Sequence, residues 1–182
     1  AFTVKGDLDG SLTAQSVQSL TVTGSVNGST INLTGSNAQL GKLAALGLLA
    51  VRGNVSNSTI TSVANMGTIS VGGMSGSEIF AGILLGTTGL PTSNDFAVAS
   101  SIRSVNVKGL PFADSNIAAR AIGSVTLADV TTDNAGTPFG VAAKSLKAFA
   151  LRRPGQKALL WHNNESTAVF NTLPGDLRVQ LI

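Results

Sequence analysis

The sequence predicts an all-β fold: a single-domain parallel (right-handed) β-helix with about 18–20 residues per coil and loop insertions. Three observations lead to this prediction. A serine motif recurs at related spacings, alternating apolar segments that end at glycine precede it, and the composition favours strands. The chain has 182 residues, a length that suits one domain. We therefore expect residues 1–182 to form one β-helix domain.

The serine motif is a Ser-x-Ile triplet that occurs four times. Its members are Ser29 with Ile31, Ser58 with Ile60, Ser77 with Ile79, and Ser115 with Ile117. Ser11-Leu12 is a shortened relative, and the five serines are separated by 18, 29, 19 and 38 residues. A unit of 18–20 residues with occasional insertions explains all four spacings, so we expect these residues to define the repeat.

A short alternating segment lies upstream of each triplet and ends near a glycine. The segments are residues 4–6, 20–24, 49–53, 69–73 and 105–109, with degenerate copies at 122–130 and 146–155. Successive side chains of a strand point to opposite faces, so Leu20, Val22 and Val26 are expected inward and Thr21 outward. The corner glycines are expected to adopt backbone angles that a Cβ would resist. The repeat-defining glycines are Gly24, Gly53 and Gly109.

A unit of this length is too short for a leucine-rich, helical or propeller repeat. In a β-helix, equivalent strands stack about 4.8 Å apart, with like residues above like. Valine and isoleucine columns then fill the interior, and asparagine, serine and threonine columns form hydrogen-bonded ladders. The alternative is a β-sandwich of short hairpins, because Asn27-Gly28 is a hairpin signal. That corner recurs as Asp9-Gly10, Asn57-Ser58 and Ser75-Gly76, which fits a coil as well as a hairpin.

The composition excludes several classes of protein. Hydrophobic residues make up 43% of the chain and charged residues 12%, which is the opposite of a disordered chain. The absence of cysteine excludes disulfide frameworks and thiolate metal sites. No apolar run reaches the roughly 18–20 residues of a membrane helix, so we do not expect a membrane-spanning protein.

The net charge is +3, and several basic residues lie late in the chain: Lys144, Lys147, Arg152, Arg153 and Lys157. Two interpretations stay open: an anionic partner such as an acidic glycan, and a solvated face that keeps an apolar protein soluble. We do not expect a nucleic-acid partner, because no aromatic residues for base stacking are interleaved with these cations.

Segments outside the repeat are expected to be insertions or end structures. The predicted insertions are residues 35–47, 84–101 and 131–140, and residues 156–182 are predicted to form a C-terminal cap or closing strands. The 84–101 segment is either a long loop or a diverged extra coil. Phe139 is expected to anchor the third insertion in the core.

Several segments resemble strand-repeat segments of very large secreted or surface proteins of environmental bacteria. They are "IGSVTL" (122–127), "SVNVKGL" (104–110), "DSNIAARA" (114–121) and "GGMSGSEIFAGILLG" (72–86). "GTPFGVAAKSLKAF" and the terminal "DLRVQLI" resemble the C-terminal portion of such proteins. The resemblance implies a parallel β-helix and an extracellular or cell-surface location, and it implies no catalytic residues.

The sequence offers little for catalysis. Polysaccharide-degrading β-helices need clustered carboxylates, and the strongest such group here is Asp114 with Asp129 on adjacent coils, with Arg103 or Arg120 nearby. A surface ion pair between coils is the alternative interpretation. We expect no enzyme, no catalytic residue and no cofactor.

Metal binding is not expected either. Asp7 and Asp9 lie in "GDLDGS", which resembles a calcium loop superficially but lacks the further oxygen ligands. Under the repeat alignment they fall where Ser25 and Asn27 occur, as outward corner residues. His162 is the only histidine and cannot make a zinc site alone.

The two ends of the predicted β-helix expose strand edges. The residues expected at these assembly edges are Phe2, Val4, Leu177, Val179 and Leu181. Unpaired edges recruit further strands, so we expect either that the chain is a fragment of a longer solenoid or that its ends are used for assembly. The sequence therefore predicts a non-catalytic extracellular structural β-solenoid that associates with itself head to tail into a surface fibre, sheath or matrix. The alternative is an adhesin or glycan-binding module that uses residues 84–101 and 131–140, and a carbohydrate-active enzyme comes third.

Overall fold

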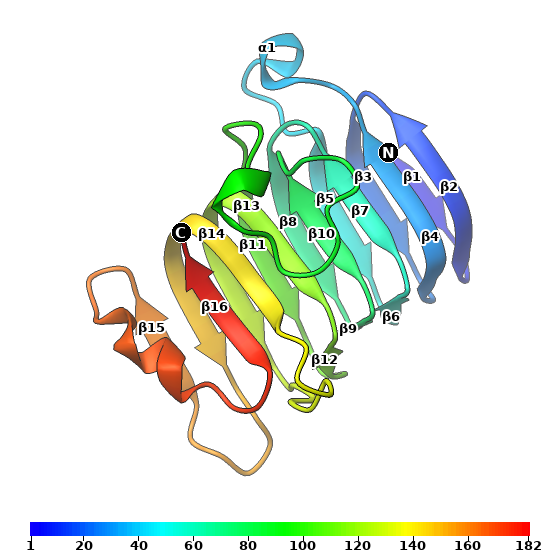
Figure 1. Cartoon of the computed structure of the whole chain (residues 1–182). Helices are drawn as coiled ribbons and strands as arrows, with labels where there is room; N and C mark the ends of the chain where they lie inside the picture. Colours follow the sequence, from blue (N-terminus) through cyan, green and yellow to red (C-terminus); the bar gives the residue numbers. More distant parts are fainter.

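The computed structural model describes residues 1–182, and most of the chain forms strands of one 16-stranded sheet (Figure 1). The ladder between β14 (Phe139–Leu151) and β15 (Leu159–His162) is antiparallel. Every other ladder is parallel. The prediction of an all-β chain is confirmed. The parallel pairing is compatible with a β-helix and does not fit a sandwich of hairpins, whose neighbours run antiparallel.

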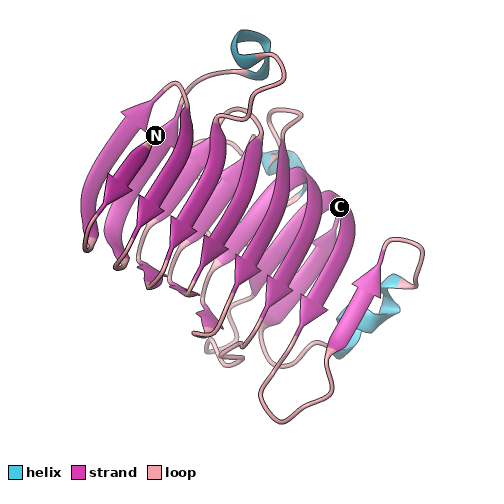
Figure 2. Cartoon of the chain, turned by 180° about the vertical axis from the view of Figure 1, so that it is seen from behind, coloured by secondary structure: helices cyan, strands magenta, loops and turns pink.

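The strands lie on three faces, and each circuit of the chain visits the faces in turn. Face A consists of β1 (Phe2–Val4), β3 (Val17–Val22), β5 (Leu46–Val51), β8 (Met66–Val71), β11 (Ser101–Val107) and the later parts of β13 (Asn116–Leu127) and β14. Face B is short and consists of the starts of β2 (Leu8–Ala14) and β4 (Val26–Leu33), then β6 (Asn54–Ser56), β9 (Gly73–Ser75) and β12 (Phe112–Ala113). Figure 2 brings face A to the front.

Face C closes each circuit. It consists of the ends of β2 and β4, then β7 (Thr59–Ser62), β10 (Glu78–Ala81), the early parts of β13 and β14, and β16 (Leu177–Leu181). Figure 1 shows this face in front.

The register places like apolar residues above one another inside the molecule. Ile31 pairs with Ile60, Ile60 with Ile79, and Ile79 with Ile117, and all four are at most 1% exposed. They belong to a continuous core of 40 buried residues. Alternation along the strands decides which residues enter this core, as predicted for residues 20–26: Leu20, Val22 and Val26 are buried, and Thr21 is only half-buried. The Ser-x-Ile spacing was therefore a correct guide to strand register.

The turn between faces B and C uses a left-handed residue in each of the four circuits that carry a Ser-x-Ile serine. This residue directly precedes the repeat serine, and its φ is +55° at Gly28, +48° at Asn57, +56° at Gly76 and +41° at Asp114. Glycine adopts this conformation freely, and Asn and Asp tolerate it better than other residues do. The chain therefore places one of these three residue types at each such turn.

At two of the corners that end face A, glycine is required for a different reason. Gly24, Gly53 and Gly109 do not have positive φ, so the prediction of special backbone angles is wrong for all three. A Cβ at Gly24 would lie 2.7 Å from the Gly6 carbonyl carbon, and one at Gly53 would lie 2.9 Å from the Gly24 carbonyl oxygen. Successive circuits approach too closely here for a side chain. Gly109 has open space around it and meets no such constraint.

The predicted insertions end earlier than expected, because each strand resumes where apolar residues re-enter the core. β5 begins at Leu46, β11 at Ser101 and β14 at Phe139, which is fully buried as the predicted anchor. The first insertion contains the four-residue helix α1 (Asn37–Leu40). The second is a loop with the 3₁₀ turn η1 (Ser93–Asp95), closed by an antiparallel bridge between Ile83 and Phe96, so it is not an extra coil.

The C-terminal segment closes one end of the core. β15 runs antiparallel to β14, and the 3₁₀ helix η2 (Thr167–Thr172) places Phe170 against Phe149 and Trp161, with ring centroids 5.9 Å and 4.9 Å apart. β16 then returns to face C. The helices of the chain are short, and none has the length and apolar character that a membrane span requires.

Candidate functional site

The repeat serines form a buried hydrogen-bonded column, which we call the serine ladder: Ser29, Ser58, Ser77 and Ser115. The Ser29 N–H donates to the Ser58 hydroxyl (3.0 Å), the Ser58 N–H to Ser77 (3.1 Å), and the Ser77 N–H to Ser115 (3.1 Å). Each hydroxyl in turn donates to the carbonyl two residues earlier in its own circuit. All four are at most 1% exposed. The ladder thus satisfies backbone groups that water cannot reach at this corner.

Ser11 does not belong to the ladder, although its spacing suggested a shortened repeat. A register shift between Asp9 and Ser11 pairs Ser11 with Thr30. The N–H that donates to the Ser29 hydroxyl is therefore that of Gly10 and not that of Ser11. The core register is preserved by the pairing of Leu12 with Ile31. The apparent spacing of 18 residues is therefore one residue short because of a β-bulge.

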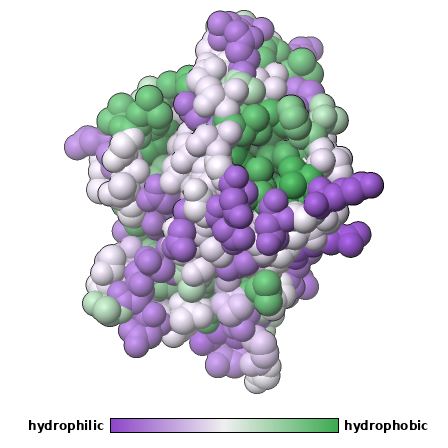
Figure 3. Space-filling model, turned by 90° about the vertical axis from the view of Figure 1, so that its right-hand side faces the viewer, coloured by the Kyte–Doolittle hydropathy of each residue, from purple (hydrophilic) through white to green (hydrophobic).

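The β1/β2 end of the molecule leaves inward apolar residues without cover. Val4, Leu8 and Leu12 face inward but are only partly buried, whereas their partners one circuit further in are at most 1% exposed. Those partners are Val22, Val26 and Ile31. β1 pairs only with β3 and β2 only with β4, and Phe2 is 56% exposed. Figure 3 shows the side on which β1 and β2 lie, with apolar surface gathered in two areas.

The opposite end differs, because its predicted edge side chains mostly lie inside. Leu177 and Val179 are buried in the core, and Leu181 is 37% exposed. At this end β15 and β16 each pair with β14 alone, so the backbone of each of these two strands has one unpaired side. The sequence showed the alternation of these residues, but it did not reveal the cover that η2 and β15 give to the core.

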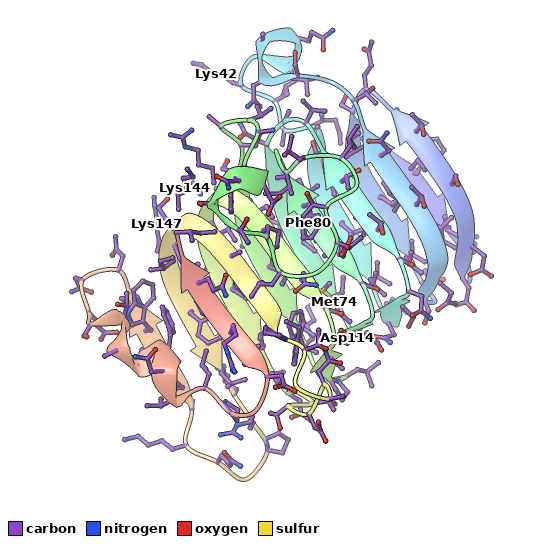
Figure 4. All side chains as sticks on the ribbon, viewed as in Figure 1. Lys42, Met74, Phe80, Asp114, Lys144 and Lys147 are labelled. Atoms are coloured by element: carbon purple, nitrogen blue, oxygen red, sulfur yellow. The ribbon has the colours of Figure 1, made fainter.

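The second insertion, residues 82–100, crosses the outer side of face C. It does so above a small external cluster in which Phe80 packs with Ala118 and Ala142, and Ile83 and Phe96 cover them. Figure 4 labels Phe80 where the insertion passes. Phe80 pairs with Ala118, and Ala118 with Ala142, so small residues leave room for the aromatic ring. The sequence signal for this contact was a phenylalanine at the outward position after Ile79, where other circuits have Thr61 or Asn32.

One hydrogen bond attaches this insertion to β10, and others stabilise its own conformation. Glu78 accepts the Gly89 N–H at 2.8 Å, and Asp95 accepts the N–H and hydroxyl of Thr92 at 2.7 and 2.8 Å. The bonds from Thr92 lower the pKa of Asp95. Burial raises the pKa of Glu78 above its ordinary 4.5, and the Gly89 bond opposes that shift.

Two grooves flank the insertion. An apolar groove of about 390 Å³ lies beside β7 and is lined by Leu84, Leu85 and Val98 among others. A polar groove of about 360 Å³ has no hydrophobic residue in its lining. It contains Glu78, Asp114, Asn57, Asn116, Thr59 and Thr88 with two glycines. Both insertions border the polar groove, because Asn134 of the third insertion donates to Asp114 at 2.9 Å.

The predicted catalytic constellation is not assembled. Asp114 lies at the turn between faces B and C and Asp129 at the turn between faces A and B, each hydrogen-bonded to a neighbouring N–H group. Arg103 lies near the start of a face A strand and Arg120 where face C passes into face A, at the other end of these strands. The arginines are therefore remote from both carboxylates. His162 is exposed on β15.

The first two aspartates are corner residues, as the repeat alignment predicted. Asp7 accepts the Ser25 N–H, and Asp9 pairs with Asn27. No group of three or more His, Cys, Asp or Glu side chains is placed to hold a metal ion.

Comparison of the chain with protein-family models, with curated proteins and with solved structures finds no match.

Proposed function

We propose that this chain is a non-catalytic structural module with a parallel, right-handed β-helix fold, in which each circuit is one coil. The three faces, the parallel ladders and the serine ladder support this fold. Parallel crossovers within one sheet are right-handed in nearly all proteins, which supports the handedness. The extracellular or cell-surface location in the proposal rests on the resemblance of the repeats to segments of secreted bacterial proteins.

The module extends into a fibre, sheath or matrix by adding a further coil to its β1/β2 end. The observation that carries this function is the incomplete burial of Val4, Leu8 and Leu12 at that end, in columns that are fully buried one coil further in. A second copy would bury these side chains and pair the free edges of both strands. The unpaired side of β16 continues face C and is the matching edge for β2. Such a contact is heterologous and gives an open filament.

Replacing Leu12 with lysine tests this assembly. The wild-type protein is expected to form a series of oligomers whose size grows with concentration in sedimentation velocity. Leu12→Lys is expected to abolish that growth, because the ammonium group would lose its water of hydration in the contact between two copies. Thr13→Lys is the matched control, because it adds the same charge to the same strand. Thr13 is exposed on the outer side, so the new lysine would stay in water.

Circular dichroism and thermal melting establish that both variants remain folded. A wild-type protein that stays monomeric at high concentration contradicts the proposal. A single closed dimer also contradicts it, because an isologous contact cannot extend.

A glycan-binding module is the second candidate function. The specific observation in its favour is the polar groove between the two insertions, which offers carboxylate, amide and hydroxyl groups to sugar hydroxyls. A glycan array with the purified protein tests it, followed by the double variant Glu78→Gln/Asp114→Asn. The variant keeps the acceptor for Gly89 and a residue that tolerates left-handed φ, and we expect at least about tenfold weaker binding of the selected glycan, equal to about 1.4 kcal/mol.

Asp9→Asn is the control for that variant, because Asp9 is an exposed corner carboxylate outside the groove. It is expected to leave glycan affinity unchanged. If the protein binds no glycan on the array, the glycan-binding function is rejected.

A further inference from the structure

A row of cations follows one edge of face A, at the position directly after each face A strand. The register makes Val4, Val22, Val51, Val71, Val107, Leu127 and Leu151 one inward column, which is buried except at Val4. The next residues along the chain are therefore also stacked: Lys5, Thr23, Arg52, Gly72, Lys108, Ala128 and Arg152. Each of them after Lys5 donates its backbone N–H to the carbonyl of the inward column one circuit earlier. The row is thus fixed by the backbone.

Cations occupy every second place in this row. Lys5, Arg52, Lys108 and Arg152 are all exposed, and they alternate with a threonine, a glycine and an alanine. Neighbouring strands lie 4.7–4.9 Å apart, so the cations recur about every 9.5 Å along the molecule. This distance is close to the Debye length of about 8–10 Å in physiological salt, which limits their mutual repulsion. The arrangement therefore presents a regular line of positive charge at little cost to the fold.

The surface beside the row is suited to a hydroxylated ligand. The outward column next to it consists of Thr3, Thr21, Ala50, Ser70, Asn106, Thr126 and Ala150. A groove of about 350 Å³ lies between Arg52 and Lys108, and Gly72 opens it because it has no side chain. Thr21 and Ser70 line the same groove. It contains no acidic and no aromatic residue.

Two acidic residues lie at this corner, and each accepts a backbone N–H group. The carboxylate of Asp7 accepts the Ser25 N–H, and that of Asp129 accepts the Val130 N–H at 2.8 Å. Among the Lys and Arg side chains, the one that donates hydrogen bonds within the chain is Arg178, on another strand. The four cations of the row are therefore available to an external anion.

We propose that the cation row Lys5–Arg52–Lys108–Arg152 and the groove beside it bind a linear acidic polysaccharide along the axis of the molecule. An acidic sugar in every second position would meet a cation at each contact, and the neutral sugars between them would lie over the small residues. Hydroxyl and amide groups of the adjacent column bind sugar hydroxyls. Single-stranded nucleic acid is disfavoured, because the groove has no aromatic side chain on which bases could stack. The groove between Arg52 and Lys108 is separate from the polar groove on face C, and of the four cations only Lys5 lies beside the β1/β2 end.

The test compares two double variants with the same change in net charge. Arg52→Gln/Lys108→Gln removes the two cations that flank the groove, and Lys42→Gln/Lys144→Gln removes two exposed cations outside the row. Lys42 lies in the first insertion, and Lys144 lies at the corner where face C passes into face A, at the opposite end of the face A strands from the cation row (Figure 4). The probe is hyaluronate, in which a uronate alternates with a neutral sugar. Binding is measured by isothermal calorimetry in about 0.15 M salt, below the concentration at which copies associate.

We expect the wild-type protein to bind hyaluronate and not neutral dextran. The groove variant is expected to lose about tenfold in affinity, equal to about 1.4 kcal/mol, and the control variant less than threefold. Thermal melting checks that both variants fold. Equal losses in the two variants, or no binding of hyaluronate by the wild type, overturn the proposal. The proposal is also overturned if the wild-type protein binds DNA more tightly than hyaluronate and the groove variant loses as much affinity for DNA as for hyaluronate. That result would assign the cation row to nucleic acid.

Discussion

Replacing Phe149 with alanine is expected to lower the free energy of unfolding by about 3–5 kcal/mol. Phe149 is 1% exposed and stacks in register between Val125 and Trp161. Its ring meets that of Phe170 edge to face at 87°. Removal of the ring creates a cavity in the core and also takes away the surface on which η2 rests. A domain of this size has about 5–15 kcal/mol of stability in total, so the loss is large.

Urea denaturation followed by circular dichroism measures this effect, provided that the transition is two-state. Lys147→Ala is the control, because Lys147 is exposed on the same strand, and it should change stability by no more than about 0.5 kcal/mol. Phe149→Leu keeps most of the volume and should cost less than Phe149→Ala. A loss below about 1 kcal/mol for Phe149→Ala would show that the C-terminal segment does not depend on this contact.

Replacing Ser58 with alanine is expected to cost about 1–3 kcal/mol, because it leaves the buried N–H of Ser29 without an acceptor. The Ser56 carbonyl also loses its donor at 2.7 Å. The effect comes from desolvation of a buried polar group and not from lost packing, since the two side chains differ by one oxygen atom. Thr59→Ala is the neighbouring control, because Thr59 is only half-buried.

The serine ladder also predicts an order among its members. Ser77→Ala should cost as much as Ser58→Ala, because each removes the acceptor of a buried N–H. Ser29→Ala should cost less, because the N–H that it serves belongs to the exposed Gly10. Equal losses at all three positions would contradict this order and would point to an effect on the unfolded chain.

Much of the strand register was predictable from the serine motif. The Ser-x-Ile triplets gave the correct pairing of Ile31, Ile60, Ile79 and Ile117, because parallel stacking requires the same side chain at the same depth in each circuit. The inward and outward alternation followed for the same reason. The alignment of Ser11 with Ser29 was wrong, because Ser11 pairs with Thr30. In the sequence, a one-residue bulge cannot be distinguished from a shorter repeat.

The candidate sites were much less predictable than the fold. Lys5, Arg52, Lys108 and Arg152 are separated by 47, 56 and 44 residues, so no constant spacing connects them in the sequence. Insertions of different length lie between them, and only the strand pairing shows that they stack. The uncovered β1/β2 end and the closed opposite end also depend on packing, because both carry the same alternating apolar pattern.

The sequence by itself determined the class of structure, the strand register and the identity of most core residues. These properties depend on local alternation and on repetition, which a linear pattern records directly. The tertiary structure decided which charged residues share an edge, how the 82–100 insertion folds over face C, and which end of the core is covered. These properties depend on contacts between residues far apart in the chain, and the length of the loops between them does not specify those contacts.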